Sequence, residues 1–389
     1  MSELSLEPKI TMEDFSGSHH EIGVQQGEAV RGLISQLMRV LPELDAFRRM
    51  KPVLIPTFLF LSFAKRRAAD LLEEDIFQIY PSQAERLRGI SEGCGMDLPM
   101  LMLLQSMEML IGKITEAHYR LEACTSIGFE PERTATGEPI VAKNFDYLNE
   151  LAPFHLSCRT RPSGRFGTMG CMMAPLPGML DGMNEHGLTV TYNLGYTTDE
   201  PEVHAPISMA LQEMLETCRT TGEAVEFITK VRQGGHDALL TIADAEGDIR
   251  AVELTPKRSS TRGPSGGLIV NTNHYHTEEL QRHEIPRNAI WDGDVHELLV
   301  GRRIFGSTER RLMRAEELLE NFGRIDEEGV KRILRDHGVD DEPSDTTICR
   351  HGEISSSLRS MIFYPRQKKM KLLYGHPCQN EYQEFSFYS

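Results

Sequence analysis

The chain has 389 residues and a formal net charge of -16, because 58 Asp and Glu outnumber 42 Lys and Arg. Its 40% of hydrophobic residues is enough to bury a large core, which excludes a disordered chain and allows one large domain or two ordinary ones. The acidic balance makes nucleic acid and anionic membrane surfaces unfavourable partners, so we expect neither. The composition leaves a homo-oligomer open.

The N-terminal region carries no targeting or membrane-spanning signal. Its first ten residues, MSELSLEPKI, lack the basic and apolar regions of a signal peptide, which predicts a cytoplasmic location. The longest apolar stretch, VLIPTFLFLSFA at residues 53–64, contains Pro56 and is too short to cross a bilayer. We expect a buried helix or a hydrophobic flap there, and no membrane insertion.

Helical and strand-like patterns divide the chain just before Cys124. Residues 21–108 repeat apolar positions at helical spacing. After this point, short β-branched or alternating segments bounded by Gly, Asp, Asn and Pro are typical of antiparallel strands, and helical blocks interrupt them at 207–231 and 307–323. Strands and helices in separate runs favour a layered α+β architecture over a doubly wound parallel sheet.

The cysteines and histidines give no sign of a metal site. Seven cysteines are dispersed without a CxxC pair, which fits a reducing compartment and predicts neither a disulfide framework nor a structural zinc site. For His274, His276 and His283 no acidic partner stands at a familiar spacing, so we expect solvated or core histidines. The glycine-rich TRGPSGG is not followed by the Lys-Ser/Thr of a phosphate-binding loop. We expect no metal and no organic cofactor.

One cysteine, Cys124, stands at the change from helical to strand-like sequence. A lone small thiol there is typical of an ordinary core position. A thiol becomes a useful nucleophile when a base lies close enough to take its proton. Cleavage of the Ala123–Cys124 bond would supply that base, because a free α-amine has a pKa of about 7.7 to 8.0 and is partly neutral at pH 7.

Short motifs in a fixed order carry a family resemblance. They are FSGSHHEIGVQQG, LRGISEGCGMD, ACTS, AKNFDY, DGMNEHGLTVTYNLGY, IVNTNHY, STERRLMR and GHPC. Together they resemble the penicillin acyltransferase family of N-terminal-nucleophile hydrolases, self-cleaving cysteine enzymes related to bile-salt hydrolase, penicillin V acylase and acid ceramidase. The resemblance implies a four-layer αββα sandwich, in which residues 1–123 form a helical propeptide or small subunit and residues 124–389 the catalytic domain.

The resemblance also implies roles for individual residues. Asp146 in AKNFDY matches the aspartate that holds the freed amine of Cys124 toward its thiol. Lys143 stands where relatives usually carry arginine, and a lysine lacks the rigid fork for bidentate binding. Asn193, through its main-chain N–H, and Asn273, through its side chain, match the donors aimed at the oxygen of the tetrahedral intermediate, each worth roughly a hundred- to a thousand-fold in rate.

Arg311 in STERRLMR matches the arginine that steadies the surroundings of the nucleophile. Each of these residues also has an ordinary interpretation: turn or strand-end residues for the aspartate and the asparagines, and a solvated helix ion pair for the arginine. A papain-like Cys-His-Asn protease is disfavoured, because no papain-type or caspase-type sequence surrounds Cys124.

The function implied by the resemblance has two steps. In the precursor zymogen, the thiol attacks the carbonyl of Ala123 and the chain is cut. In the mature enzyme, the same thiol attacks a linear amide, in a small N-acyl or peptide-like substrate, and an acyl-thioester forms on Cys124. We expect a cysteine amide hydrolase. An acyltransferase that passes the acyl group to an amine, and a non-catalytic, uncleaved member of the fold, are the alternatives.

Overall fold

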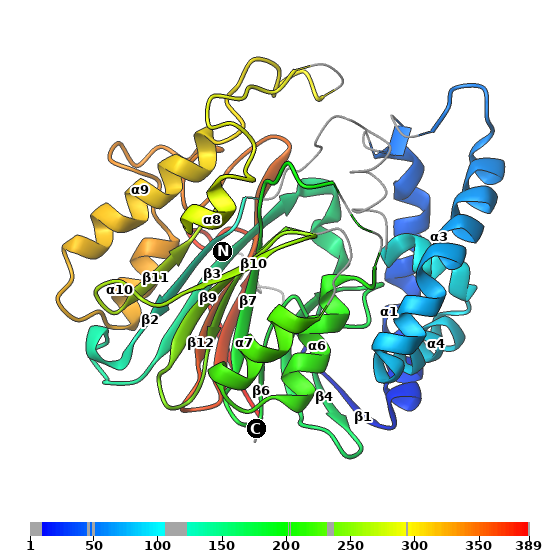
Figure 1. Cartoon of the computed structure of the whole chain (residues 1–389), viewed down its shortest axis with the longest axis horizontal. Helices are drawn as coiled ribbons and strands as arrows, with labels where there is room; N and C mark the ends of the chain where they lie inside the picture. The colour runs from blue at the N-terminus through cyan, green and yellow to red at the C-terminus, as the bar shows by residue number, and fades with distance from the viewer. Residues whose placement is uncertain are drawn as a thin grey trace, which may run out of the picture.

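The computed structural model describes residues 10–44, 47–48, 51–105, 123–200, 202, 204–231, 237–292 and 295–387. Two stacked β-sheets form the centre of the molecule (Figure 1). In the first sheet the strand order is β1-β4-β5-β6-β7-β8-β9-β10. Its strands are β1 (Glu13–Gly17), β4 (His155–Pro162), β5 (Thr168–Met173), β6 (Asp181–Asn184), β7 (Thr189–Leu194), β8 (Ala238–Ala243), β9 (Ile249–Leu254) and β10 (Ser259–Arg262).

The second sheet has six strands in the order β11-β2-β3-β12-β13-β14. They are β11 (Leu268–Asn271), β2 (Thr125–Phe129), β3 (Ile140–Leu148), β12 (Ser355–Tyr364), β13 (Lys369–Tyr374) and β14 (Gln383–Ser386). All six strands pair antiparallel. The central strands of both sheets are buried along their whole length, as β2, β7, β8 and β12 show, because each lies between a facing sheet and a covering layer.

Helices cover the outer faces of the two sheets. The helices α6 (Ile207–Thr217) and α7 (Thr221–Lys230) pack on the eight-stranded sheet, whereas α9 (Gly306–Glu320) and α10 (Glu327–Leu334) pack on the six-stranded sheet (Figure 1). The result is the four-layer αββα sandwich implied by the resemblance. Short helical turns complete the connections: η1 (Leu41–Glu43), η2 (Pro131–Arg133), η3 (Asn149–Phe154) and α8 (Glu278–Gln281).

The N-terminal helices form a group at one end of the sandwich (Figure 1). They are α1 (His19–Val40), α3 (Thr57–Ile79) and α4 (Pro81–Cys94). The axes of α1 and α4 approach so closely that a Cβ at Gly23 would meet the Arg86 carbonyl oxygen at 2.1 Å, and one at Gly89 would meet the His20 carbonyl oxygen at 2.1 Å. Only glycine fits at these crossing points, so the spacing of glycines in both motifs has a packing reason.

This N-terminal part is not a separate layer. The strand β1 pairs parallel with β4, with Glu13 opposite Cys158, and so forms the edge of the eight-stranded sheet. The side chain of Gln26 on α1 donates to the Leu176 carbonyl oxygen at 2.8 Å, and that of Gln105 donates to the Pro175 carbonyl oxygen at 2.6 Å. Residues on both sides of position 123 therefore share one sheet and one core.

The apolar stretch at residues 53–64 does not form the buried helix that was one of the two structures expected from the sequence. Its second part begins α3, but the side chains of Phe58 and Phe63 are 70% and 72% exposed, and Val53 and Leu54 are exposed as well. The inward face of α3 is formed instead by residues further along, such as Leu72 and Ile76. No helix in the described part of the chain is long and apolar enough to span a membrane.

Candidate active site

Cys124 lies directly before β2, next to the strand that carries Asp146. The β2–β3 register places Thr125 opposite Asn144, which brings the residues before β2 alongside the end of β3. The Cys124 side chain is fully buried, and its Sγ lies 4.0 Å from the main-chain oxygen of Asp146. The main-chain N–H of Ala123 donates to the same oxygen at 3.5 Å. The pairing of β2 with β3 therefore places the expected cleavage position next to the main chain of Asp146.

The Asp146 carboxylate is only half satisfied. Its Oδ1 accepts a hydrogen bond of 2.7 Å from Ser357, its partner across the β3–β12 pair, whereas Oδ2 is buried and has no hydrogen-bond partner among the described residues. Burial raises the pKa of Asp146 to about 6, although the charges of Arg311 and Arg350 act in the opposite direction. A buried acceptor with an unused oxygen is costly unless another donor binds there.

Arg311 connects the cysteine to Asn273. It extends from α9, and its Nη1 donates to the Cys124 carbonyl oxygen at 2.5 Å and to Thr125 Oγ1 at 3.0 Å, while Nη2 donates to Asn273 Oδ1 at 2.9 Å. Its side chain is almost completely buried, so the solvated ion pair considered from the sequence does not apply to it. Burial lowers the pKa of Arg311 to about 10, which leaves the guanidinium charged at neutral pH.

Asn273 is held in place from three sides. Its main-chain N–H donates to Thr308 Oγ1 at 2.7 Å, and its Nδ2 donates one hydrogen to the Leu194 carbonyl oxygen at 2.8 Å. Its Oδ1 already accepts from Arg311. The amide group is therefore oriented with its acceptor used, and the second hydrogen of Nδ2 is the one that it can offer to a substrate oxygen.

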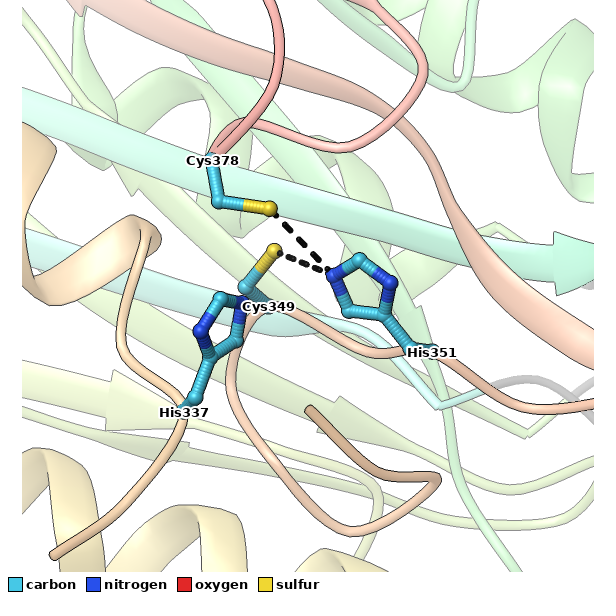
Figure 2. A group of neighbouring side chains, drawn as sticks. All are labelled: His337, Cys349, His351 and Cys378. Atoms are coloured by element: carbon cyan, nitrogen blue, oxygen red, sulfur yellow. Dashed lines mark hydrogen bonds between the residues drawn. The ribbon is translucent and has the colours of Figure 1, made fainter. Parts of the chain in front are cut away.

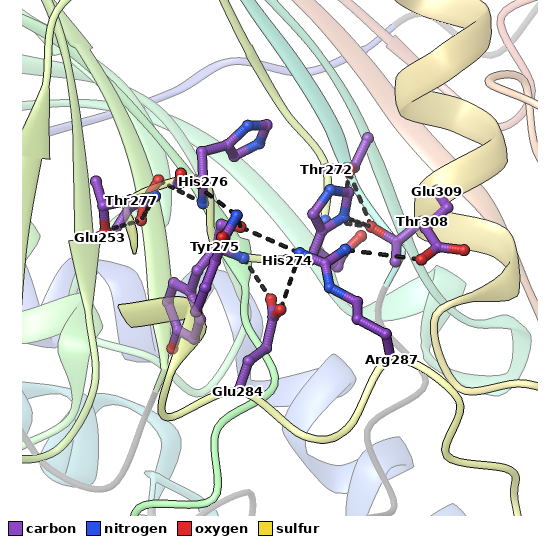
Figure 3. Close-up of polar contacts among 12 residues, drawn as sticks. Glu253, Thr272, His274, Tyr275, His276, Thr277, Glu284, Arg287, Thr308 and Glu309 are labelled. Atoms are coloured by element: carbon purple, nitrogen blue, oxygen red, sulfur yellow. Dashed lines mark hydrogen bonds and ion pairs between the residues drawn. The ribbon is translucent and has the colours of Figure 1, made fainter. Parts of the chain in front are cut away.

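The loop around Asn273 is fixed by a polar network (Figure 3). Glu253 accepts from the main-chain N–H groups of His276 and Thr277, each at 3.0 Å, and Glu284 accepts from that of Tyr275 at 2.6 Å. His274 Nδ1 lies 2.9 Å from Thr308 Oγ1. Burial lowers the pKa of His274 to about 3 and that of His276 to about 2, so both imidazoles are neutral. Within the described residues they do not join His283 in a metal-ligating group.

Asn193 is fully buried near the end of β7. Its main chain is part of the β7–β8 ladder, opposite Leu239. Both hydrogens of its Nδ2 are used, at 3.1 Å to the Asn271 carbonyl oxygen and at 2.9 Å to that of Thr272, and its Oδ1 accepts from Ser126. The asparagine thus orients the main chain that leads into Asn273.

Lys143 belongs to a second buried cluster. Successive residues of a strand point to opposite faces, so Lys143 and Asp146, three positions apart, extend from opposite sides of β3. The Lys143 ammonium donates to Asp181 Oδ1 at 2.6 Å and to the Tyr192 carbonyl oxygen, between the two sheets. Arg359 binds the other oxygen of Asp181 at 2.8 Å. Lys143 is therefore not grouped with Cys124.

A pocket of about 670 Å³ lies over this constellation and includes Ala123, Tyr196 and the first turn of α9 in its walls. Five arginines line it against two acidic residues, Glu309 and Asp345; they are Arg302, Arg303, Arg310, Arg311 and Arg350. The pocket is therefore cationic in a strongly acidic chain. Sequence reasoning missed Tyr196, Ser357 and Arg350. The motif DGMNEHGLTVTYNLGY ends at Tyr196 but gives this residue no role, whereas Ser357 and Arg350 lie outside the motifs and only the fold brings them to Asp146.

Comparisons with known proteins show the family of the chain. A family model described as acyl-coenzyme A:6-aminopenicillanic acid acyl-transferase matches residues 133–379, which is more than half of the chain. A search of curated proteins finds no match.

Similar solved structures include a variant of conjugated bile acid hydrolase from Clostridium perfringens, with 14% identity over 68% of this chain and 97% of that chain at a TM-score of 0.42. A Caenorhabditis elegans orthologue of N-acylethanolamine-hydrolyzing acid amidase has 16% identity over 62% and 93% of the two chains at 0.41. Penicillin V acylase from Agrobacterium tumefaciens has 17% identity over 65% and 83% at 0.42.

Proposed function

The chain belongs to the acyl-coenzyme A:6-aminopenicillanic acid acyl-transferase family, and from this premise we propose that it is a self-processing cysteine amide hydrolase whose nucleophile is Cys124. The observation that carries the proposal is that Asp146 Oδ2 is buried and has no hydrogen-bond partner among the described residues, while the main-chain oxygen of the same residue lies 4.0 Å from the Cys124 sulfur. A new α-amine at Cys124, released by cleavage after Ala123, would give this buried oxygen the donor that it lacks.

Processing begins with the thiol of the uncut chain. Asp146, whose pKa is about 6, is largely ionised at neutral pH and can accept the thiol proton. The sulfur adds to the Ala123 carbonyl carbon, the Ala123–Cys124 C–N bond breaks, and the nitrogen of Cys124 takes a proton. The resulting thioester is hydrolysed by water, which leaves a carboxylate on Ala123 and returns the thiol to Cys124.

In the mature enzyme the same sulfur attacks the carbonyl carbon of a substrate amide. The free amine of Cys124, held by Asp146, accepts the thiol proton and passes it to the departing amine. The remaining hydrogen of Asn273 Nδ2 supports the oxyanion, and Arg311 fixes Asn273 against the main chain of Cys124. Water then releases the acid from the acyl-thioester. We assign Asn193 and Lys143 positioning roles. The main chain of Asn193 belongs to the β7–β8 ladder and its side chain orients the residues before Asn273, while the ammonium of Lys143 binds Asp181.

The positive charge of the pocket indicates that anionic substrates are preferred. Arginines around the reacting carbon favour an acyl or amine part that carries a carboxylate or phosphate group. Transfer to an amine acceptor is the second candidate, and the family match favours it. An acyl-coenzyme A donor carries phosphates of the kind that this pocket could bind.

A denaturing gel tests self-cleavage. The purified chain should give two fragments, residues 1–123 and 124–389, with Cys124 at the new N-terminus by Edman sequencing. Cys124→Ala should stay whole and inactive, whereas Cys94→Ser, a half-buried cysteine outside the site, should be cut normally. An intact wild-type chain that hydrolyses amides would overturn the proposal.

A panel of substrates separates hydrolysis from transfer. The cut protein is assayed with N-acyl amino acids, neutral acylated amines, penicillin V and acyl thioesters, each with and without an added amine. Hydrolysis predicts release of free acid that added amine leaves unchanged, whereas transfer predicts a new amide at the expense of free acid. Anionic substrates should react faster than neutral analogues of the same length.

A further inference from the structure

We propose that His337, Cys349, His351 and Cys378 form a structural zinc site (Figure 2). They come from three separate segments of the chain. His337 follows α10, Cys349 and His351 precede β12, and Cys378 lies between β13 and β14. Their ligand atoms all lie within 4.8 Å of one another, far from the cleavage position in sequence.

The distances fit a tetrahedral ion. Zinc–sulfur bonds of about 2.3 Å and zinc–nitrogen bonds of about 2.0 Å place tetrahedral ligand atoms roughly 3.3 to 3.8 Å apart. His351 Nε2 lies 3.3 Å from Cys349 Sγ and 3.3 Å from Cys378 Sγ, as the dashed lines in Figure 2 show. A small movement of the fourth ligand, His337, would complete the tetrahedron. Two thiolates with two imidazoles is a donor combination typical of structural zinc.

The fourth ligand is already oriented. His337 Nε2 is buried without a hydrogen-bond partner among the described residues, while its Nδ1 lies 3.2 Å from an oxygen of Asp341. A carboxylate on the outer nitrogen is the usual device that fixes the tautomer of a metal-binding histidine. The ring of His351 is likewise held, because His376 stacks on it with centroids 3.9 Å apart.

Two other interpretations account for fewer of these groups. A disulfide between Cys349 and Cys378 would use the thiols but leave two histidines facing them without a purpose. A single thiol–imidazole nucleophile would use one cysteine and leave the buried nitrogen of His337 unpaired. Zinc uses all four groups: the two thiols release their protons, and two thiolates with two neutral imidazoles balance the charge of one Zn²⁺ ion.

The site also has a connection to the candidate active site. Arg350 lies between two of the ligands and lines the cationic pocket. Its main-chain N–H donates to Ser357 Oγ at 3.0 Å, and its carbonyl oxygen accepts from the Ser357 N–H at 3.0 Å. Ser357 in turn donates to Asp146. An ion that ties these loops together would fix the Asp146 carboxylate through Ser357. With four protein ligands it has no open position for catalysis.

Metal content is measured in the full-length Cys124→Ala variant, so that the result does not depend on self-cleavage. Protein produced with added zinc and purified without chelator should contain about one zinc per chain by mass spectrometry of metals. After removal of zinc, Co²⁺ should give the visible absorption of tetrahedral coordination together with thiolate charge-transfer bands. Octahedral-type spectra, or no metal with a Cys349–Cys378 disulfide in the intact mass, would overturn the proposal.

Substitutions locate the ion. Cys378→Ser should lose most of the zinc, while Cys94→Ser should keep it. Asp341→Asn leaves all four ligands present and suits the left-handed backbone at this position, so it should fold normally and weaken zinc affinity about 10- to 100-fold. Full zinc content with unchanged affinity in both Cys378→Ser and Asp341→Asn would contradict the assignment.

Discussion

Two fully buried carboxylates, those of Asp146 and Asp181, lie on opposite sides of β3. They differ in their hydrogen-bond partners and in the direction of their pKa shifts. Asp181 has both oxygens bound to cations, Lys143 at 2.6 Å and Arg359 at 2.8 Å. Burial alone would raise its pKa, but these two charges lower it. Asp146 has a hydroxyl on one oxygen and no partner on the other among the described residues, and burial raises its pKa to about 6.

The charges of these two carboxylates have opposite effects on the stability of the fold. Because the folded-state pKa of Asp181 is lowered, its charge stabilises the fold, and that contribution disappears as the pH falls through the folded pKa. Because the folded-state pKa of Asp146 is raised, its charge costs stability, and this cost grows as the pH rises from the unfolded value of about 3.9 to about 6. Because Asp146 lowers the stability of the fold at neutral pH, its presence calls for a functional explanation.

The largest effect is expected from Asp181→Asn. It leaves the ammonium of Lys143 and the guanidinium of Arg359 buried with a neutral partner, which should lower the free energy of unfolding by about 3 to 5 kcal/mol. Urea denaturation followed by circular dichroism measures this. Glu226→Gln, which removes an exposed ion pair with Lys230, is the control and should leave the urea midpoint almost unchanged.

Asp146→Asn should leave the stability of the fold nearly unchanged but slow self-cleavage. Removing a charge that costs stability leaves the urea midpoint near that of the uncut Cys124→Ala chain. Self-cleavage should slow at least about 100-fold, because the base for the thiol is lost. A pulse-chase of newly synthesised chain on denaturing gels gives the rate. Rapid cleavage of Asp146→Asn would remove Asp146 from the mechanism.

Arg311→Lys tests the link between the nucleophile and Asn273. A lysine keeps the charge but cannot bind the Cys124 carbonyl oxygen and Asn273 Oδ1 from two nitrogens at once, so we expect kcat of the cut enzyme to fall about tenfold. The neighbouring Arg310 lies in the pocket wall but makes neither of these contacts, and Arg310→Lys keeps its charge, so this variant should change kcat less than twofold. Both variants keep the positive charge, so an equal loss in both would contradict a specific role for the two contacts of Arg311.

The smallest effect is that of pH on processing. Asp146 is ionised above its pKa of about 6 and protonated below it, so the cleavage rate should be about half-maximal at pH 6 and about tenfold lower at pH 5. A chase of newly synthesised chain into buffers between pH 5 and 8 provides the profile. A flat profile over this range would mean that another group accepts the thiol proton.

Much of this arrangement could be predicted from the sequence, because the relevant signals are local. The change of pattern before Cys124 marks the start of β2, and the motif around Asp146 marks the strand that pairs with it. The layered α+β class follows from runs of strands and helices. The motif STERRLMR also predicted that Arg311, and not its neighbour Arg310, belongs to the site. In the structure Arg311 is buried and binds the main chain of Cys124, whereas Arg310 makes no such contact.

What the sequence could not show depends on long-range pairing. The direction of Lys143 follows from strand alternation, but its partner Asp181 lies in the other sheet. Ser357 reaches Asp146 only through the β3–β12 register. The four residues of the proposed zinc site come from three loops, so no fixed spacing reveals them. The exposure of Phe58 and Phe63 depends on which face of α3 meets the core, and the apolar run alone does not specify it.

The pairing of β1 with β4 determines what a cut after Ala123 would produce. The two products would hold each other by main-chain hydrogen bonds within a common sheet, so the nicked protein would migrate as one species on a sizing column. Assembly of that shared edge would have to precede scission, and halves supplied separately would each expose an unfinished sheet. Of the two possibilities for residues 1–123, this pairing favours a retained small subunit over a released propeptide.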